Sequence, residues 1–491
     1  MGLALALAGW LIGRRVARAR VSGVLSLLLD MCGPLGMFLY LAWATSKPIF
    51  AGLTSFSLLG GLAFADFYKR ETLREPVIFS DMSELIEVGR HPELYLPFVG
   101  PKRVIAGAVA AVGLMGTLCA LEPAAWAWSP WRALASAGTF VVMIWMLAGP
   151  LNPASATLLR RFHPSDDPAA DSSRLGPLVS LILYGVIARA ERSARATRAG
   201  AQAQAALEAA ACSDCTGPVV LVQCESFTDP RHLRAGTADA SPRFDEACSS
   251  AWSGRLTTPT WGANTVRTEF EVLTGIDSQA LGYDRFNPYH GFVQAPLPSV
   301  AFILRAQGYR TVCVHPYDRR FYNRHRVLPR LGFDAFYGIE AFAGAETRRG
   351  FVTDAAVAEF VQRLLDQARQ PLFIFVITME NHGPWAASKD GDSLATYVQG
   401  VSAGDAMLGR LADCVVRDRG GVLGFYGDHG PALTDAGDDL RTDYIVCGGA
   451  ATVRVQQDAS AFALGGVLLS ALSQGGVPAP AVEGAADKLS A

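Results

Sequence analysis

The sequence predicts a bundle of transmembrane α-helices, followed by an α/β domain with a mostly parallel central sheet. Half of the 491 residues are hydrophobic and only 18% are charged, which is more apolar than a typical soluble protein. The apolar excess is concentrated before residue 152. Beyond residue 216, short apolar runs alternate with helical patterns, as in parallel α/β sheets. The chain therefore divides into a membrane part and a soluble part.

The N-terminal part, residues 1–155, is expected to cross a membrane about four or five times. Four apolar runs approach the roughly 20 residues that span a bilayer. They are residues 21–44, 49–65, 104–121 and 133–151. The opening run, residues 3–13, is shorter and is followed by RRVARAR instead of the small residues of a signal-peptide cleavage site. We therefore expect it to be a short first span.

An acidic residue, Asp30, lies inside the first of the four long runs. An ionisable group within a membrane span is costly and often functional. The neighbouring Gly33 and Pro34 support a second interpretation, a kinked site that faces other parts of the protein. The sequence leaves both interpretations open.

Residues 156–215 are expected to form interfacial or linker helices. The apolar run at 175–188 is shorter than a full span and either crosses the membrane or lies in its interface. Residues 189–211 are rich in Ala, Arg, Gln and Glu, which favours an exposed helical connector. The CSDC segment at 212–215 is expected to hold a local disulfide or no bond, because no second pair completes a zinc site.

Positive charge is the main guide to orientation. Both RRVARAR at 14–20 and the basic loop at 69–103 are expected in the cytoplasm by this criterion. Four full spans after RRVARAR would leave the soluble domain in the cytoplasm, whereas an additional crossing at 175–188 would place it outside. The number of crossings stays open.

The soluble domain is expected over residues 216–473. Five apolar runs are predicted to be its strands: residues 218–224, 311–315, 371–378, 421–427 and 443–447. Apolar residues recur at helical spacing over 357–368, with Thr353 or Asp354 as the cap, and over 397–415. The tail at 474–491 is rich in Gly, Ala and Pro and is expected to be disordered.

Chemically active side chains follow four of the predicted strands. Glu225 follows the first, His315 ends the second, His382 follows the third, and Asp428 and His429 follow the fourth. Open α/β sheets bind ligands at the carboxyl ends of their strands. We therefore expect these five side chains to lie along one edge of the sheet.

A carboxylate beside an imidazole, as in Asp428 and His429, suits Zn, Mn or Fe, and additional carboxylates favour Mg or Mn. Taken alone, GDHG is explained equally well as a turn in which Asp428 bonds the backbone. Thr265 lies in TTPTWGANTVRTEFEVLTG, where a helical pattern begins. It is either a helix cap or a nucleophile activated by a metal and by the helix N-terminus.

Five motifs carry a family resemblance: QCESF, GANTVRTEFEVLTG, FYNRH, TMENHGPW and FYGDHG, in this order. They closely resemble the lipoteichoic acid synthase-like family, whose members are membrane phosphoglycerol transferases. Their catalytic domain is of the sulfatase type, within the alkaline phosphatase superfamily. The resemblance implies that residues 216–473 form such a domain and that the helical bundle anchors it.

The resemblance also implies roles for single residues. Thr265 would be the nucleophile, and one divalent ion, Mn in preference to Mg, would be held by Glu225, Thr265, Asp428 and His429. The substrate-binding residues would be His382, Arg324, Tyr322, Asn323 and His315. Tyr322 stands where the family has Trp, and the acid of HPYD, Asp318, stands one position late, so it receives no role. The fork of Arg324 matches phosphate oxygens.

The implied reaction transfers glycerol phosphate from phosphatidylglycerol to a periplasmic glycan or lipid through a covalent threonine intermediate. The alternatives are a phosphoethanolamine transferase, a phosphodiesterase, or, in another class, a non-catalytic membrane sensor. No C/S-x-P-x-R signature surrounds Thr265, which argues against sulfate-ester hydrolysis. A net charge of −2 without a basic block argues against nucleic acid as a partner. The expected location is the bacterial inner membrane, with the catalytic domain on the periplasmic or extracytoplasmic side.

Overall fold

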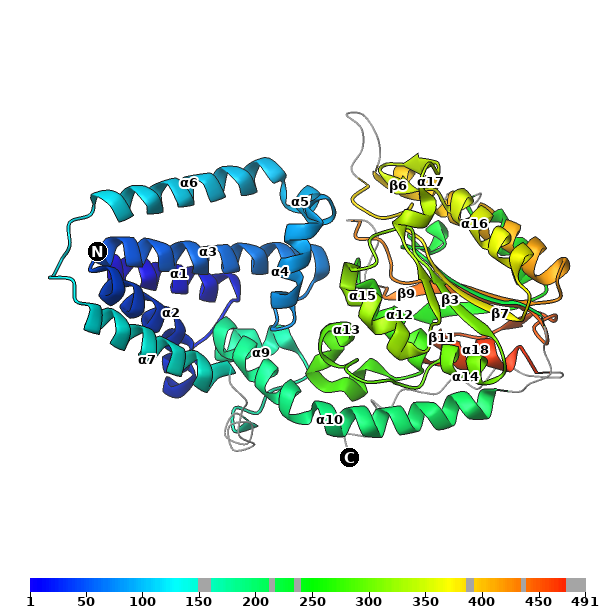
Figure 1. Ribbon diagram of the computed structural model, residues 1–491, viewed down its shortest axis with the longest axis horizontal. Coiled ribbons are helices and arrows are strands. Elements are labelled where there is room, and N and C mark those ends of the chain that lie inside the picture. The colour runs from blue at the N-terminus through cyan, green and yellow to red at the C-terminus, as the bar shows by residue number, and fades with distance from the viewer. Residues whose placement is uncertain (149–159, 212–216, 234–239, 386–392, 434–438, 474–491) are drawn as a thin grey trace. The chain divides into compact units, whose positions relative to one another are not determined.

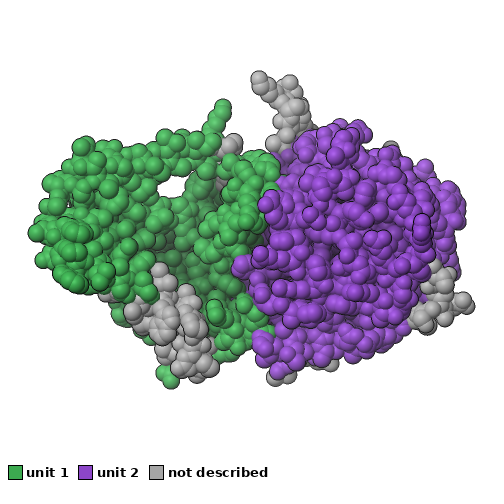
Figure 2. Space-filling model, viewed as in Figure 1, with its two compact units in different colours: residues 1–192 green, residues 193–491 purple. Residues whose placement is uncertain are grey.

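The computed structural model describes residues 1–148, 160–211, 217–233, 240–385, 393–433 and 439–473. The chain divides into two compact units, residues 1–192 and residues 193–491 (Figures 1 and 2). The CSDC segment at 212–215 and the tail at 474–491 lie outside the described residues.

The first unit is helical. Its helices are α1 (Gly2–Val16), α2 (Val24–Thr45), α3 (Pro48–Leu73), α4 (Asp81–Arg90), α5 (Pro92–Val99), α6 (Pro101–Leu121), α7 (Pro130–Ala148), α9 (Pro168–Leu175) and the first half of α10 (Pro177–Ala210). Within the described residues, three helical segments are long and apolar enough to cross a membrane: Val24–Thr45, Pro48–Leu73 and Val104–Leu121. They match three of the four predicted long spans, and the fourth, 133–151, extends beyond the described residues.

Helices α1 and α3 run parallel and touch through glycines. A Cβ atom added to Gly2 would lie 1.8 Å from the carbonyl oxygen of Pro48, and one added to Gly9 would lie 3.0 Å from the Cα atom of Phe56. Small residues allow the backbones of membrane helices to approach this closely. At 15 residues, α1 is about 22 Å long, shorter than the roughly 30 Å hydrocarbon core of a bilayer.

Asp30 faces the interior of the first unit. Its carboxylate accepts hydrogen bonds from Arg14 Nη1 at 2.8 Å and Trp10 Nε1 at 2.9 Å, both on α1. It also accepts the backbone N–H of Leu178, in the first turn of α10, at 3.0 Å. A carboxylate at a helix N-terminus is favoured by the helix dipole. Of the two interpretations of Asp30, the structure therefore supports the protein-facing one.

Helices α6 and α7 run antiparallel to α3 and α2, respectively. Glu122, just after α6, accepts the backbone N–H groups of Ile49 at 2.7 Å and Phe50 at 2.6 Å, so the end of α6 meets the start of α3. The rings of Tyr40 and Phe140 stack with centroids 4.6 Å apart, which pairs α2 with α7. The chain thus passes through the bundle in the order α1, α2, α3, α6 and α7.

Residues 160–178 lie at the end of the bundle that also carries RRVARAR. The backbone N–H of Arg20 donates to the carbonyl oxygen of Ser173 at 2.8 Å, and Arg70 Nη2 donates to the hydroxyl of Ser172 at 3.2 Å. Most of the apolar run at 175–188 lies in α10, a 34-residue helix that is not among the three span candidates. Both basic segments and the exit of the chain therefore share one end of the bundle.

The second unit is built on a central sheet (Figure 1). The sheet has nine strands in the order β10-β2-β9-β8-β1-β7-β3-β4, with β11 beside β2. The five predicted strands are β1 (Val219–Cys224), β3 (Arg310–Val314), β7 (Leu372–Ile377), β8 (Val422–Gly427) and β9 (Arg441–Gly448). The central strand β1 runs parallel to β7 and β8, whereas β9 is antiparallel to β8 and β2. The predicted mostly parallel sheet is confirmed.

The sequence analysis missed the short and edge strands. They are β2 (Trp252–Thr257), β4 (Ala335–Tyr337), β10 (Val455–Gln456), β11 (Ala459–Ser460) and the hairpin of β5 (Thr347–Arg348) with β6 (Phe351–Val352). Most are only two or three residues long, and β2 reads SGRL in its centre, so neither length nor apolar character marks them.

Helices cover both faces of the sheet. They are α11 (Pro242–Cys248), α12 (Thr265–Thr274), α13 (Pro288–Gly291), α14 (Val300–Ala306), α15 (Arg324–Val327), α16 (Asp354–Gln367), α17 (Ser393–Leu411) and α18 (Ala461–Ser470). Side chains alternate along β1: Val219 and Leu221 pack with α12, α14 and α18, and Val220 and Val222 pack with α16 and α17. Both predicted helical stripes are confirmed, and Thr353 caps α16.

Candidate active site

Of the four predicted metal ligands, the three other than Thr265 meet at the carboxyl ends of the central strands. Glu225 follows β1, and Asp428 and His429 follow the neighbouring strand β8. Their ligand atoms all lie within 4.8 Å of one another. His429 Nε2 is 3.4 Å from Glu225 Oε1 and 3.3 Å from Asp428 Oδ2. All three residues are buried.

Glu225, Asp428 and His429, which we call the acidic trio after their two carboxylates, fit a divalent cation. Asp428 Oδ2 is buried and has no hydrogen-bond partner among the described residues. Burial and the charge of Glu225 raise the pKa of Asp428 to about 6, and burial raises the pKa of Glu225 as well. Two buried carboxylates with one imidazole are a donor set that Mn, Zn or Mg accepts, and a cation would compensate both charges.

Thr265 is the first residue of α12, and the N-cap is Asn264, so the cap interpretation of Thr265 does not apply. The Thr265 hydroxyl lies close enough to Asp428 to lower the pKa of that carboxyl. One turn later, the Thr268 hydroxyl donates to the carbonyl oxygen of Asp428 at 2.6 Å, which ties α12 to β8. The partly exposed Thr265 side chain therefore sits beside the trio, at the positive end of a helix.

Ser226 is a site residue that the sequence analysis missed. Its backbone N–H donates to Asp428 Oδ1 at 2.8 Å, and its hydroxyl donates to Glu225 Oε1 at 2.9 Å and lies 3.4 Å from His429 Nδ1. These contacts depend on a left-handed backbone with φ of 52°, which is uncommon outside glycine. The only signal in the sequence is its place next to Glu225.

His382 lies in the loop after β7. Its Nδ1 donates to the carbonyl oxygen of Gly383 at 2.7 Å, which leaves Nε2 as an acceptor. Burial lowers the pKa of His382 to about 4, so the ring is neutral at neutral pH. The charges of His429 and Asp428 also act on this pKa, so His382 lies within electrostatic reach of the trio. Arg349 Nη2 holds the loop by donating to the carbonyl oxygen of His382 at 2.7 Å.

The structure brings Arg324 and His315 together, in a buried pair with Glu269. Arg324 is 1% exposed, and its Nη2 and Nε donate to the Glu269 carboxylate at 2.7 and 3.1 Å. Arg324 Nη1 donates to His315 Nε2 at 3.2 Å. Burial and the charge of Arg324 hold the pKa of His315 well below its usual value, so the ring is a neutral acceptor. Glu269 lies on α12, one turn after Thr265.

Tyr322 and Asn323 precede Arg324 and are partly exposed. Both adopt a left-handed backbone, with φ of 54° and 61°. The guanidinium carbon of Arg324 lies 5.3 Å from the centre of the Tyr322 ring, a cation–π distance. The charge of Arg324 lowers the pKa of Glu225, so this group lies within electrostatic reach of the trio.

Glu269 also connects α12 to the two strands that carry the trio. Gln223, two residues before Glu225, donates its side-chain amide to Glu269 Oε2 at 3.4 Å. Tyr426, two residues before Asp428, donates its hydroxyl to Gln223 Oε1 at 2.6 Å. The Tyr289 hydroxyl donates to Glu269 Oε1 at 2.8 Å. Hydrogen bonds join five buried residues, which we call the polar floor: Gln223, Tyr289, Tyr426, Glu269 and Arg324.

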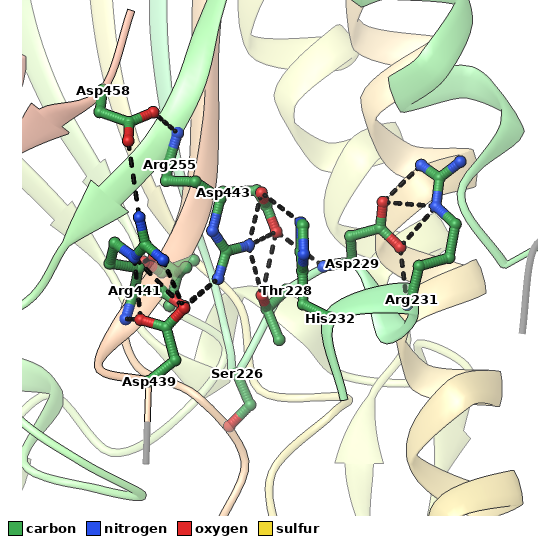
Figure 3. A network of polar contacts seen from close by, with 12 residues as sticks. Ser226, Thr228, Asp229, Arg231, His232, Arg255, Asp439, Arg441, Asp443 and Asp458 are labelled. Atoms are coloured by element: carbon green, nitrogen blue, oxygen red, sulfur yellow. Dashed lines mark hydrogen bonds and ion pairs between the residues drawn. The ribbon is translucent and has the colours of Figure 1, made fainter. Parts of the chain in front are cut away.

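A second network holds the loop after β1 (Figure 3). Asp443, on β9, accepts the Thr228 hydroxyl at 2.9 Å and the backbone N–H of Asp229 at 2.7 Å. Arg255, on β2, donates to the same carboxylate at 2.7 Å. The ion pair with Arg255 and the hydrogen bonds outweigh burial and lower the pKa of Asp443. Contacts from β9 and β2, the antiparallel strands of the sheet, therefore hold the loop that begins with Glu225.

Comparisons with known proteins find a family model and several relatives. Residues 218–460 match the family model described as Sulfatase. A protein of Rhizobium meliloti (strain 1021), named provisionally for cyclic beta-1,2-glucan modification, is 33% identical over 233 residues, which cover 44% of this chain and 36% of the relative. The chain thus spans about a third of that relative.

A second relative from the same organism, the capsular polysaccharide biosynthesis protein RkpI, is 28% identical over 441 residues, covering 83% of this chain and 78% of that protein. Among solved structures, the lipoteichoic acid synthase LtaP from Listeria monocytogenes is similar, with 20% identity and a TM-score of 0.46 over 54% of this chain and 74% of that one. The match to the Sulfatase model supports an enzyme of the phosphotransferase or hydrolase type. Residues 218–460 are therefore a sulfatase-family domain.

Proposed function

We propose that the protein is a metal-dependent phosphoglycerol transferase, which moves glycerol phosphate from phosphatidylglycerol to a glycan or lipid acceptor. The position of Thr265 carries the proposal. Its hydroxyl is partly exposed, stands at the N-terminus of α12 and lies beside the buried Asp428 of the acidic trio. This arrangement suits a nucleophile that must carry negative charge as it reacts. The five motifs that resemble the lipoteichoic acid synthase-like family favour a phosphodiester substrate.

Glu225, Thr265, Asp428 and His429 would hold one divalent ion, with Mn preferred over Mg. Such an ion lowers the pKa of a bound hydroxyl and balances charge on phosphoryl oxygens. Ser226 keeps Glu225 and Asp428 in place through its hydroxyl and its backbone N–H.

The transfer takes two steps. First, Thr265 Oγ loses its proton and attacks phosphorus, the bond from phosphorus to the diacylglycerol oxygen breaks, and that oxygen takes a proton. Glycerol phosphate is then esterified to Thr265. Second, the acceptor hydroxyl loses its proton and attacks the same phosphorus, and Thr265 Oγ leaves and is protonated again. Each step exchanges one phosphorus–oxygen bond for another, the pattern of covalent catalysis.

His382 is the candidate base for the second step. Its Nδ1–H is held by Gly383, and its pKa of about 4 keeps Nε2 free to accept a proton at neutral pH. A donor role would require the protonated ring, which the low pKa disfavours. Arg324 attracts the phosphoryl group from the polar floor, and the buried His315 holds Arg324 in place through Nε2. Tyr322 and Asn323 complete the head-group site.

A glycan is the favoured acceptor. Both Rhizobium relatives carry names that refer to a glucan or a capsular polysaccharide. Phosphatidylglycerol is a membrane lipid, and the apolar helices of the first unit would keep the enzyme at the surface where this donor lies. We place the domain on the extracytoplasmic side, where such glycans are modified.

The test uses the purified full-length chain with fluorescent phosphatidylglycerol. Wild type with Mn is expected to release fluorescent diacylglycerol, and EDTA should abolish the release until Mn is restored. Thr265→Ala should release none, whereas Thr265→Ser, which keeps a hydroxyl, should retain part of the activity. Release by Thr265→Ala at the wild-type rate would remove Thr265 from the mechanism. Release from phosphatidylethanolamine alone would identify a phosphoethanolamine transferase, and release from neither lipid would support a non-catalytic protein.

A further inference from the structure

Asn264 immediately precedes Thr265 and has an unsatisfied buried side chain. The residue is 5% exposed, and its side-chain Nδ2 has no hydrogen-bond partner among the described residues. An unsatisfied buried amide destabilises a folded protein by about 1–3 kcal/mol. Its position beside the nucleophile suggests a role for this donor.

The Asn264 side chain also makes no capping hydrogen bond. Asn264 is the N-cap of α12, a position at which Asn normally bonds a backbone N–H of the first turn, yet it makes no such bond. Its backbone is left-handed, with φ of 64°, instead of the extended conformation usual for an N-cap. The Asn264 carbonyl still accepts the N–H of Arg267 at 2.9 Å. The helix is therefore started by the backbone, and the amide is left available.

The preceding loop fixes this geometry. The Thr260 hydroxyl donates to the carbonyl oxygen of Ala263 at 2.6 Å, and Gly262 takes up a left-handed φ of 66°. Gly262, Ala263 and Thr265 are partly exposed, so the segment around the amide is open to a ligand.

The Thr265 hydroxyl has neighbours of two kinds. It contacts the carboxylate of Asp428, which belongs to the acidic trio and attracts a cation. It also stands at the N-terminus of α12, directly after Asn264, where the first N–H groups have no acceptor within the helix. Hydrogen-bond donors at a helix N-terminus bind the oxygens of phosphate groups.

We propose that Asn264 Nδ2 donates a hydrogen bond to a non-bridging oxygen of the phosphoryl group that Thr265 attacks. The inference rests on the proposed function, which supplies a phosphodiester at this place. Asn264 neither gains nor loses a proton. Its amide stabilises the charge on phosphoryl oxygens while the bond to the leaving group is exchanged for the bond to Thr265.

The test distinguishes the effect of the Asn264 side-chain amide from the effect of its left-handed backbone. Asn264→Gly removes the amide but suits the left-handed φ, so its melting temperature should equal or exceed that of wild type. Loss of an oxyanion donor typically lowers kcat by about 10²–10³-fold, and we expect a decrease of this order in diacylglycerol release. Asn264→Asp, which also tolerates a left-handed backbone, puts a carboxylate in place of the donor and should be at least as damaging.

A second readout is the affinity of the Mn-loaded protein for orthovanadate, a mimic of phosphoryl transfer, measured by calorimetry. We expect at least about a tenfold loss in Asn264→Gly, which corresponds to one hydrogen bond to a charged group. The control is Asn287→Gly, which changes a buried N-cap asparagine whose side chain does cap, by accepting the N–H of His290 at 3.1 Å. It should show the opposite pattern, a lower melting temperature with unchanged vanadate affinity.

Equal vanadate affinity in wild type and Asn264→Gly would overturn the inference, and so would a wild type that binds no vanadate. Failure of the proposed function gives a different result, since a wild type that binds vanadate in an Asn264-dependent manner but releases no diacylglycerol contradicts only the assignment of the lipid donor.

Discussion

Ser226 shows how one residue can hold two candidate metal ligands that follow different strands. Its hydroxyl bonds Glu225 and its N–H bonds Asp428, and both contacts depend on φ of 52°. Partners of this kind typically change metal affinity by about 10–100-fold when they are removed. We therefore expect Ser226→Ala to weaken Mn binding by about that factor, as measured by isothermal titration calorimetry.

Ser226→Gly serves as the matched variant. It also lacks the hydroxyl, but it relieves the left-handed backbone that alanine would strain by about 1 kcal/mol. Both variants should lose Mn affinity alike, while the glycine variant melts at the higher temperature. Wild-type Mn affinity in both would show that the hydroxyl does not support the site.

Glu271, a buried residue of α12, should make the free energy of unfolding depend on pH. Burial raises its pKa from 4.5 to about 8, although its carboxylate accepts the N–H of Ser278 at 2.9 Å. Between these two values the folded protein holds a proton that the unfolded chain has lost. The contribution of Glu271 to the free energy of unfolding therefore falls as pH rises from about 4.5 to 8, by a few kcal/mol.

Glu271→Gln keeps the acceptor oxygen and removes the titration. In urea unfolding followed by tryptophan fluorescence, its stability relative to wild type should increase from pH 5 to pH 9. Glu246→Gln makes the same change at an exposed carboxylate paired with Arg243, and it should leave that pH dependence intact. A constant difference between Glu271→Gln and wild type across this range would contradict the raised pKa.

At the scale of elements, the polar floor links α12 to β1 and β8. The link passes from Tyr426 through Gln223 to Glu269, one turn after Thr265. Tyr426→Phe removes the first hydrogen bond and leaves Gln223 Oε1 without that donor, which should cost about 1–3 kcal/mol of stability. Because Thr265 and Asp428 would then be held less firmly, we expect kcat for diacylglycerol release to fall several-fold with little change in KM.

The control for this prediction lies on the neighbouring strand. Tyr444 pairs in register with Tyr426, and its hydroxyl donates to the carbonyl oxygen of Gln457 at 2.7 Å, away from the floor. Tyr444→Phe should lose a similar hydrogen bond and leave kcat unchanged. An equal effect of the two substitutions on kcat would mean that the floor does not position the site.

The same elements show what the sequence could and could not predict. Apolar runs bounded by polar residues identified the five principal strands, and parallel pairing then placed Glu225, Asp428 and His429 at one edge. The left-handed turns at Ser226 and Asn264, and the pairing of Arg324 with Glu269, depend on contacts between segments far apart in the chain. No local pattern in the sequence encodes such contacts, and the predicted substrate contact of Arg324 did not include its buried partner.

At the scale of the whole molecule, the path of the chain through the first unit determines which segments lie on the same side of the membrane. After RRVARAR the chain passes through α2, α3, α6 and α7 and returns to the same end, where Ser173 meets Arg20. RRVARAR and the start of α10 should therefore lie on one side of the membrane. The positive charge there predicts that this side is the cytoplasm, whereas the proposed reaction requires that it face outside.

Labelling of the full chain with a membrane-impermeant thiol reagent decides between them. In cells with a permeabilised outer membrane, the exposed substitutions Arg20→Cys and Arg417→Cys should be labelled above the wild-type background. Ala124→Cys, after α6 at the other end of the bundle, should not. Labelling of Ala124→Cys alone would place the domain in the cytoplasm and contradict the proposed reaction, and different results for Arg20→Cys and Arg417→Cys would contradict the path of the chain.

The residues with a left-handed backbone near the candidate site have a consequence for directed evolution. Ser226, Asn264, Tyr322 and Asn323 all occupy backbone conformations that glycine adopts at lower cost. A library selected only for survival of heat should therefore enrich glycine at these four positions. Ser226 and Asn264 adjoin Glu225 and Thr265, and Tyr322 and Asn323 are proposed to bind the head group. The variants selected in this way should therefore be more stable to heat and less active.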